Sequence, residues 1–435
     1  MDTAAIDLQH QFYDMLMQSQ YWPPERMRDY QRSELEQLLH HARTNVPFYE
    51  HRLDKVVGSG GAIDWERWEE IPIVKRRDLI EHRQAMQANV LPPGHGPVGS
   101  IRTSGSTGLS VEVTVTRLAR LASDASRWRA NGWAGLVFSE AMCIRHGEDQ
   151  RLQPPNGERA GPWGPLWLSR NELGASFRMG QFWSAADQLD FVRRAGAPYL
   201  AIGGGGVAHI LAMEAERSGA RDVSIEFILT NGEQSSLQTR NLCTRVFGAT
   251  IVDLYSSKEG AHMAHPCPHG SGYHVNAERV LIELVDDHGQ QVPPGAVGRV
   301  VVTPFHSTGQ PLIRYDQGDL ARWGACSCGR TLPLLATIDG RADHQFRHPD
   351  GRRWHRSFPQ ENAGILKALI WQLAQVGPID FEIRYVPLTD DVGDEEHVAA
   401  AFRDWYFPEA KVRFKRLEQI ELTRAGKYME YVYEA

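Results

Sequence analysis

A short turn rich in hydroxyl groups and glycine has the residue types that bind phosphate. It consists of Thr103, Ser104, Gly105, Ser106, Thr107 and Gly108. Small residues let the backbone approach an anion, and hydroxyl and N–H groups can converge on its oxygens. The following segment, 109–115, alternates apolar and polar residues like a half-buried strand, and the turn lacks the lysine of a Walker loop. The turn therefore indicates a nucleotide site between strands, with a plain hairpin loop as the alternative.

More segments with chemically useful residues follow in order along the chain. They are Asn231-Gly232-Glu233, Tyr255-Ser256-Ser257-Lys258-Glu259-Gly260, Arg314–Leu320, Ile338–Asp343 and Arg424–Lys427. The first two stand at the ends of predicted strands. Each segment alone could be an ordinary loop or a solvated charge, so their shared order carries more weight than any single motif.

In this order, the segments resemble the motifs of the adenylate-forming superfamily of acyl-CoA synthetases. Residues 38–49, 71–79 and 326–333 further resemble its phenylacetate-CoA ligase branch. The resemblance extends from about residue 30 to Lys427. It implies an α/β fold with a large N-terminal adenylation core, residues 1–340, and a small mobile C-terminal α/β lid domain, residues 341–435. The core would contain helix-covered mixed β-sheets and a β-barrel-like layer.

The resemblance also implies roles for individual residues. The turn at 103–108 would hold the β- and γ-phosphates of ATP, Glu259 would bind Mg²⁺, and Lys427 would meet the carboxylate and α-phosphate during adenylation. Charge stabilisation of this kind is the largest contribution expected in such a reaction. The remaining nucleotide-binding residues that the resemblance implies, for adenine and ribose, are Gly232, Glu233, Tyr255, Ser256, Asp319 and Arg341.

Two positions depart from the superfamily pattern. Ser256 and Lys258 replace the usual glycine and hydroxyl residue before the acid, and Leu109 stands where relatives often carry lysine. Lys258 could neutralise the α-phosphate or close part of the acid pocket, and is therefore a candidate catalytic residue. Alternatively, it could pair with Glu259 in the empty site and weaken metal binding.

A second group of residues has the chemistry of a metal site. Cys326 and Cys328 lie on a predicted loop, and the segment Cys267–His274 supplies one thiol and two imidazoles. Four such ligands in two clusters suit tetrahedral zinc. The resemblance favours Cys267, His274, Cys326 and Cys328, with His269 or His265 as substitutes. We expect a structural zinc, since no open ligand position is evident; free buried cysteines are the alternative.

The pocket for the acid is the least defined part of the site. Gly203, Gly204, Gly205 and Gly206 end a predicted buried strand and could let a flat ring lie against the backbone, or could form a tight turn. Trp133, with Trp128 and Trp183, could line the same space, although aromatic residues on helices more often belong to the core.

The elements that would position these residues alternate between helix and strand. Such alternation favours a parallel sheet covered by helices. Apolar periodicity predicts a helical entry segment over 7–50 interrupted at Pro23-Pro24, helices over 118–131, 186–194 and 208–218, a buried strand over 198–202, and paired strands over 279–285 and 297–303.

Composition sets the broad class. A chain of 435 residues with 42% hydrophobic and 23% charged residues is typical of a globular protein with two or more domains. The net charge of −7 and the lack of a basic block argue against nucleic acid as a partner. We expect a cytoplasmic protein with no membrane partner, because no apolar run or signal peptide stands out and the five cysteines form no disulfide pattern.

The expected activity is therefore ATP-dependent activation of a carboxylic acid to acyl-AMP, followed by transfer to coenzyme A. The closest-looking branch suggests an aryl or arylacetic acid. An amide- or ester-forming synthetase with an amine or hydroxyl acceptor is the alternative, and a non-catalytic nucleotide-binding protein is a third. The expected ligands are ATP, Mg²⁺, coenzyme A, the acid and a structural zinc ion; a homodimer is a possible assembly.

Overall fold

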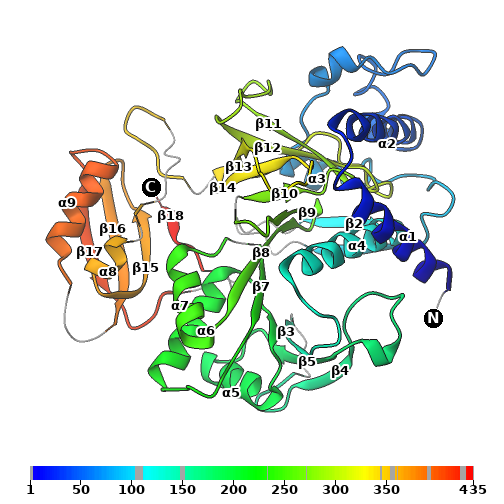
Figure 1. Cartoon of the computed structure of the whole chain (residues 1–435). Helices are drawn as coiled ribbons and strands as arrows, with labels where there is room; N and C mark the ends of the chain where they lie inside the picture. The colour runs from blue at the N-terminus through cyan, green and yellow to red at the C-terminus, as the bar shows by residue number, and fades with distance from the viewer. Residues whose placement is uncertain are drawn as a thin grey trace. The chain divides into compact units, whose positions relative to one another are not determined.

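The structure is a computed structural model, drawn in Figure 1. It describes residues 3–102, 111–146, 152–232, 234–270, 272–342, 345–352, 358–359, 361–388, 393–421 and 428–434. The chain divides into two compact units. Unit 1 contains Met1–Ala141, Gly161–Ser176 and Leu254–Ile338, and unit 2 contains Met142–Ala160, Phe177–Asp253 and Asp339–Ala435.

Unit 1 begins with two long helices, two 3₁₀ turns and one short helix. Their bounds are α1 (Thr3–Ser19), α2 (Pro24–Asn45), η1 (Pro47–Tyr49), η2 (Trp65–Glu70) and α3 (Arg76–Glu81). The predicted break at Pro23-Pro24 is confirmed, because Pro24 is the first residue of α2, where a missing N–H costs no helical hydrogen bond. The apolar side of α2 is buried through Leu35, Leu38 and Leu39.

Helix α4 (Arg117–Ala134) follows a two-stranded antiparallel sheet of β1 (Val98–Arg102) and β2 (Glu112–Thr116). Thr116 caps α4 by accepting a hydrogen bond from Ala119 N, and Gly135 ends it in the left-handed conformation. Helix α4 packs against α1 in unit 1. The predicted helix and the predicted strand after the glycine-rich turn are both confirmed.

The main sheet of unit 1 has the strand order β11-β12-β13-β14-β10-β9-β8. The bounds are β8 (Thr250–Ser257), β9 (Ala261–Pro266), β10 (Tyr273–Val275), β11 (Val280–Val285), β12 (Val297–Pro304), β13 (Tyr315–Gly324) and β14 (Leu334–Arg341). The predicted pairing of β11 with β12 is confirmed from Val280 opposite Pro304 to Val285 opposite Arg299. Apolar residues of these strands and of α2 form one continuous core.

Unit 2 contains a sheet with the order β8-β7-β6-β3-β5-β4, to which β8 contributes its first residues. Strands β3, β6 and β7 are parallel, and α5, α6 and α7 lie beside them (Figure 1). The bounds are β3 (Met142–His146), β4 (Glu158–Pro162), η3 (Arg170–Glu172), β5 (Ala175–Gly180), α5 (Ala185–Ala195), β6 (Tyr199–Ala201), α6 (Gly205–Arg217), β7 (Phe227–Asn231) and α7 (Leu237–Phe247).

The C-terminal segment of unit 2 has a sheet and an apolar core of its own. The sheet order is β17-β16-β15-β18, and the core joins Phe358, Trp371 and Phe402 among other residues. The bounds are α8 (Glu361–Ile365), β15 (Ala368–Gln375), β16 (Asp380–Pro387), α9 (Glu395–Trp405), β17 (Lys411–Arg416) and β18 (Tyr431–Tyr433). The division of the chain at residues 340/341, and the mobility of this segment as a lid, stay predictions.

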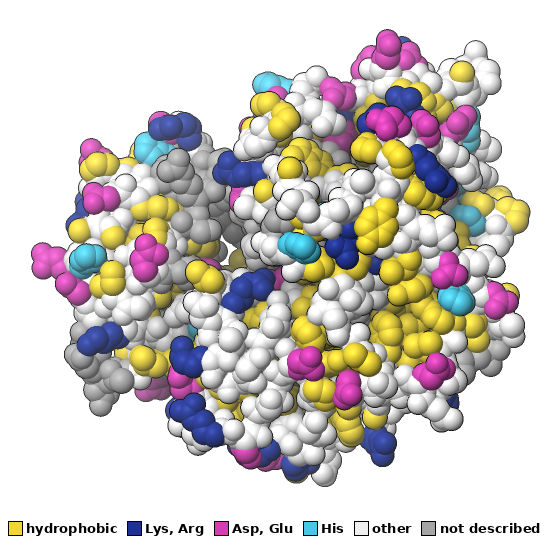
Figure 2. All heavy atoms as spheres, viewed as in Figure 1, with side chains coloured by type: hydrophobic (Ala, Val, Ile, Leu, Met, Phe, Trp, Pro, Cys, Tyr) yellow, Lys and Arg dark blue, Asp and Glu magenta, His cyan; other side chains and the backbone are white. Residues whose placement is uncertain are grey.

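The expected fold class is confirmed: the structure has large multi-stranded sheets, covering helices and a small α/β segment at the C-terminus. Acidic and basic side chains are interspersed over the face of the molecule shown in Figure 2. Within the described ranges, no helix combines the length and the apolar character needed to span a bilayer.

Candidate functional site

Two of the predicted nucleotide-binding residues meet in unit 1. The hydroxyl of Tyr255, near the end of β8, donates a hydrogen bond of 2.8 Å to Oδ2 of Asp319 in β13. Tyr255 is buried, so its ring and hydroxyl are held in one place. The sheet thus brings together an aromatic face and a carboxylate that are 64 residues apart in the sequence.

Glu259 follows β8 in the turn to β9, and its carboxylate contacts two side chains of unit 1. Arg76 Nη1 lies 3.3 Å from Glu259 Oε1, and the hydroxyl of Tyr315 donates to the same oxygen at 3.4 Å. The Glu259 side chain is only 5% exposed. Such partners offset the cost of burying a carboxylate.

Arg76 is a site residue that sequence reasoning missed. It begins α3, two residues after Val74. The N–H of Val74 donates to Arg314 O at 2.9 Å, and its carbonyl accepts from Asp316 N at 2.8 Å. These two bonds fasten the segment to the start of β13 and so bring Arg76 to Glu259. The available signal was its position within residues 71–79, one of the segments that resembles the ligase branch.

The turn that carries Lys258 and Glu259 is fixed by Ser257. Its hydroxyl accepts a hydrogen bond from Gly260 N at 2.7 Å and lies 3.1 Å from Gln317 Oε1. Lys258 is exposed and makes no ion pair with Glu259 in the described part of the chain, because Arg76 takes that position. Ser256 is half-buried in β8, opposite His262 of β9.

The four favoured metal ligands come together in unit 1. Side-chain donor atoms of Cys267, His274, Cys326 and Cys328 all lie within 4.8 Å of one another. Cys267 Sγ lies 3.3 Å from Cys326 Sγ, and His274 Nε2 lies 3.1 Å from Cys328 Sγ. A tetrahedral zinc ion with bonds of 2.0–2.3 Å would need ligand atoms about 3.3–3.8 Å apart. The donor set therefore fits zinc.

The hydrogen bonds around this cluster favour the binding of a cation. His274 Nδ1 lies 3.3 Å from the carbonyl of Leu332, which leaves Nε2 free of the ring proton and directed to Cys328. Backbone N–H groups of His269 and Cys328 donate to the sulfur atoms of Cys267 and Cys326, each at 3.4 Å. N–H donors stabilise thiolates, the form in which cysteine binds metal.

Trp133 lies beside the Cys/His cluster. Its ring centroid is 5.8 Å from that of His274, and Arg330 stacks over it at 4.5 Å. Of the other candidate pocket tryptophans, Trp128 contacts Phe138 and Trp163 in unit 1, and Trp183 donates to Leu152 O in unit 2. Each of the three therefore has packing partners that a core residue would have.

The glycine run in unit 2 forms the start of α6, with Gly204 as its N-cap. A Cβ at Gly205 would lie 2.5 Å from both Cα and Oγ of Ser235, so the close approach of two backbones requires glycine there. At Gly203, a Cβ would meet only the end of the Arg145 side chain, at 3.2 Å. The tight-turn interpretation thus accounts for Gly205.

The loop that carries Gly232 is anchored to β8 by one buried carboxylate. Asp253 accepts hydrogen bonds from Ser235 Oγ at 2.7 Å and from Ser235 N at 3.2 Å, and it also contacts Thr230 and Arg240. Gly232 adopts φ 81°, a conformation that favours glycine. Asp253 therefore fixes the end of β7 in unit 2, where Gly232 lies.

Comparison with known proteins agrees with this geometry. No model of a protein family matches the chain. The phenylacetate-coenzyme A ligase of Thermus thermophilus is 24% identical over 341 residues, covering 74% of this chain and 72% of the relative. A 2-hydroxyisobutyryl-CoA ligase, solved in the postadenylation state with R3-HIB-AMP, has a TM-score of 0.72 at 20% identity and covers 96% of this chain and 93% of its own.

The chain has the fold of the adenylate-forming ligases. The resemblance inferred from the order of the motifs is thereby confirmed. A second relative in structure, the amide bond synthetase McbA of Marinactinospora thermotolerans, has a TM-score of 0.52 at 16% identity over 75% of this chain and 67% of its own.

Several residues that the ligase resemblance singled out lie outside the described part of the structure. They are the phosphate turn Thr103–Gly108, Glu233 and Lys427. Arg341 is the last residue of β14. The candidate site residues that the structure describes in unit 1 are Tyr255, Ser256, Lys258, Glu259 and Asp319.

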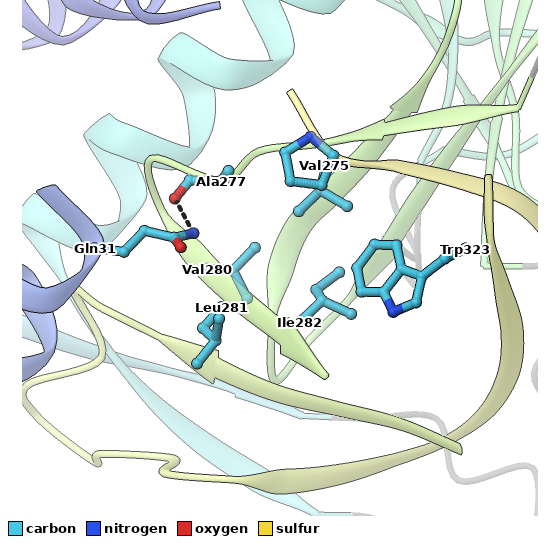
Figure 3. Close-up of a pocket in the computed structure, with 8 residues that line it drawn as sticks. Gln31, Val275, Ala277, Val280, Leu281, Ile282 and Trp323 are labelled. Atoms are coloured by element: carbon cyan, nitrogen blue, oxygen red, sulfur yellow. Dashed lines mark hydrogen bonds between the residues drawn. The ribbon is translucent and has the colours of Figure 1, made fainter. Parts of the chain in front are cut away.

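An apolar pocket of about 200 Å³ also lies in unit 1 (Figure 3). Gln31 donates a hydrogen bond of 2.8 Å to Ala277 O at its edge. The other lining residues are apolar: Val275, Ala277, Val280, Leu281, Ile282, Trp323 and Pro333. Because no charged side chain lines it, this pocket lacks a partner for the carboxylate of an acid, and we do not assign the acid to it.

Proposed function

We propose that the protein is an ATP-dependent carboxylic acid–CoA ligase. The acid carboxylate would attack the α-phosphorus of ATP, giving acyl-AMP and pyrophosphate. The thiol of coenzyme A would then attack the acyl carbon and release AMP. The related phenylacetate-coenzyme A ligase suggests an aromatic acid, aryl or arylacetic, as the substrate class.

The observation that carries this proposal is the contact between Tyr255 and Asp319, with Glu259 close by on the turn after β8. Each of the three side chains would contact a different part of a bound nucleotide. Asp319 would accept from ribose hydroxyls, and the Tyr255 ring would face the adenine. Glu259 would hold Mg²⁺, which offsets phosphate charge when bound, because carboxylate oxygens suit this hard cation.

Arg76 adds a step to the use of Glu259. Since the carboxylate is paired with Arg76, holding Mg²⁺ would require Glu259 to give up its contact with the guanidinium. Arg76 would then be released toward the phosphates, and exposed Lys258 stands on the same turn. Lys427 would supply the cation at the reacting carboxylate, as the superfamily resemblance implies.

We also propose that the Cys/His cluster holds a structural zinc ion. Four protein ligands leave no open position for catalysis. The ligands join the β9–β10 hairpin to the loop between β13 and β14, so the ion would stabilise unit 1 next to the Tyr255–Glu259 segment. Metal analysis of the purified protein tests this: about one zinc per chain supports it, and no bound zinc contradicts it.

An amide- or ester-forming synthetase is the second candidate. The fold of the amide bond synthetase McbA favours it, together with the departures at Ser256 and Lys258. The same activated acyl-AMP would then be attacked by an amine or hydroxyl instead of a thiol.

Pyrophosphate release from ATP, measured over a panel of aromatic and aliphatic acids with and without coenzyme A, tests the proposal. The ligase predicts release that depends on the acid and needs coenzyme A for sustained turnover. Acid-dependent release that coenzyme A leaves unchanged would favour the synthetase. No release with any acid, while ATP still binds, would favour a non-catalytic nucleotide-binding protein.

A further inference from the structure

A group of buried polar side chains lies where α4 packs against β9 in unit 1. It contains His262 and His265 of β9, Arg129 of α4, and Glu278 and Arg279 of the segment between β10 and β11. The ring centroids of His262 and His265 are 5.7 Å apart. We call these five residues the α4–β9 cluster.

The charges in this cluster are not balanced. Arg129 and Glu278, both fully buried, form an ion pair of 2.6 Å, and Ser19 Oγ also donates to the Glu278 carboxylate. The nearby Arg127–Asp124 pair, at 2.9 Å, is neutral in the same way. Arg279 is left without a carboxylate in contact: none lies within 4.0 Å of its guanidinium in the described part of the chain, and Asp124 and Glu278, each paired with another arginine, act on it only at longer range.

The environment of Arg279 is unusual for a guanidinium. The residue is 3% exposed, and the one hydrogen bond of its side chain among described residues is a 3.4 Å contact from Nη1 to the carbonyl of His262. Its Nε has no partner there. A buried charge without a counter-ion is costly, so a native structure normally supplies an anion.

The two histidines next to Arg279 also lack partners. His265 is fully buried, and neither of its ring nitrogens has a hydrogen-bond partner in the described residues. The same holds for Nδ1 of His262. Buried polar atoms are rarely left unpaired. Three unpartnered imidazole nitrogens and an unpaired guanidinium at one place therefore require a polar occupant.

We propose that the α4–β9 cluster binds an oxyanion through Arg279, His262 and His265. A carboxylate or phosphate-type group offers acceptors to the guanidinium and to imidazole N–H groups, and its charge would balance Arg279. The occupant could be a second acidic group on the acid substrate, or a free inorganic anion.

The position of the cluster favours the substrate as the source. Lys258 and Glu259 stand on the turn that joins β8 to β9, and Ser256 of β8 is paired with His262 of β9. The proposed catalytic turn and the cluster therefore adjoin. This source rests on the proposed ligase function and narrows the acid to one with two anionic groups.

The first experiment compares matched acids in the pyrophosphate assay. Pairs that differ by one carboxylate, such as benzoate with phthalate isomers and butyrate with succinate, isolate the second group. We expect wild-type kcat/KM to favour the diacid by about tenfold or more, the effect of one charge-assisted hydrogen bond. His262→Gln should lower this ratio severalfold, and Arg279→Lys should do the same, whereas the exposed control His288→Gln should not.

The second experiment does not need catalysis. Thermal unfolding is followed in inorganic phosphate and in chloride at equal ionic strength. If a free anion is the occupant, phosphate should raise the Tm of wild type and His288→Gln more than that of His262→Gln, because general salt effects act on all three alike.

The outcomes separate the two proposals. A diacid preference that His262→Gln reduces supports the substrate source, and phosphate stabilisation that His262→Gln reduces supports the free anion. Turnover of monoacids with neither effect overturns the oxyanion site and leaves the ligase standing. Failure of every acid, with phosphate stabilisation retained, would reject the ligase and keep the oxyanion site.

Discussion

Replacing Tyr255 with phenylalanine isolates one hydrogen bond at the nucleotide site. The substitution keeps the ring that would face adenine and removes the hydroxyl that donates to Asp319 at 2.8 Å. Asp319 would then lose the group that orients its carboxylate for ribose. We expect the KM for ATP to rise while kcat changes little, because the contact exists before the transition state and positions the ground-state ligand.

The size of the effect follows from the kind of bond. A hydrogen bond to a charged group contributes about 1.5–3 kcal/mol, and part of this is recovered when water reaches the exposed carboxylate oxygen. A loss of about 1–2 kcal/mol in ATP binding corresponds to a rise in KM of about 5–30-fold. Initial rates of pyrophosphate release at saturating acid, with ATP varied, measure it.

Tyr49→Phe is the matched control. Tyr49 is a fully buried tyrosine of unit 1 whose hydroxyl donates to Pro311 O at 3.0 Å and accepts from Ile313 N at 3.2 Å, so its removal breaks two buried hydrogen bonds. Tyr49→Phe should therefore lose at least as much stability as Tyr255→Phe, about 1–3 kcal/mol. Only Tyr255→Phe should change the KM for ATP. An unchanged KM in Tyr255→Phe, or an equal rise in Tyr49→Phe, would refute the role given to the Tyr255–Asp319 contact.

Four other perturbations have defined expectations. Arg76→Ala should lower the free energy of unfolding, measured with urea, by about 1–3 kcal/mol, because it leaves the buried Glu259 carboxylate without its cation. Arg77→Ala, at the exposed neighbouring residue, should change this free energy by less than about 0.5 kcal/mol. Cys328→Ser should reduce zinc from about one per chain to near zero in elemental analysis, with a lower Tm. Burial lowers the pKa of His306 to about 3, so the unfolded state takes up a proton first as pH falls below about 6.5. The free energy of unfolding should therefore decline by up to about 1.4 kcal/mol per pH unit. His306→Gln should make this pH dependence less steep. Lys427→Ala should slow adenylation about 10²–10³-fold yet leave thioester formation from supplied acyl-AMP in single-turnover assays, and equal loss of both steps would contradict its assigned role.

The order of the motifs was enough to predict the fold, and it singled out Tyr255 and Asp319, which the structure brings into contact. Tyr255 and Asp319 lie in β8 and β13, two strands of one sheet. The apolar patterns of such strands can be recognised in the sequence. The Cys/His cluster could also be predicted, because cysteine and histidine pairs at short spacing are common zinc ligands and the family resemblance favoured these four residues.

Ion pairs between distant charges could not be predicted. Arg76 and Glu259 are 183 residues apart, and their contact depends on two backbone hydrogen bonds that dock Val74 at β13. The sequence contains many arginines of the same charge, and only the tertiary contacts of Val74 determine that Arg76 is the one that pairs with Glu259. The packing of Trp133 against His274 could not be predicted either, and its place in an acid pocket stays a prediction.

If the glycine run at the start of α6 lines the acid pocket, as the sequence predicts, its packing limits how this scaffold could be re-engineered for other acids. In a library that randomises the run, most members would carry a side chain at residue 205, where a Cβ collides with the backbone of Ser235. At Gly203 the obstacle is the tip of one arginine, which can swing aside. Diversity is therefore best concentrated at Gly203 and Arg145 together, with Gly205 held constant.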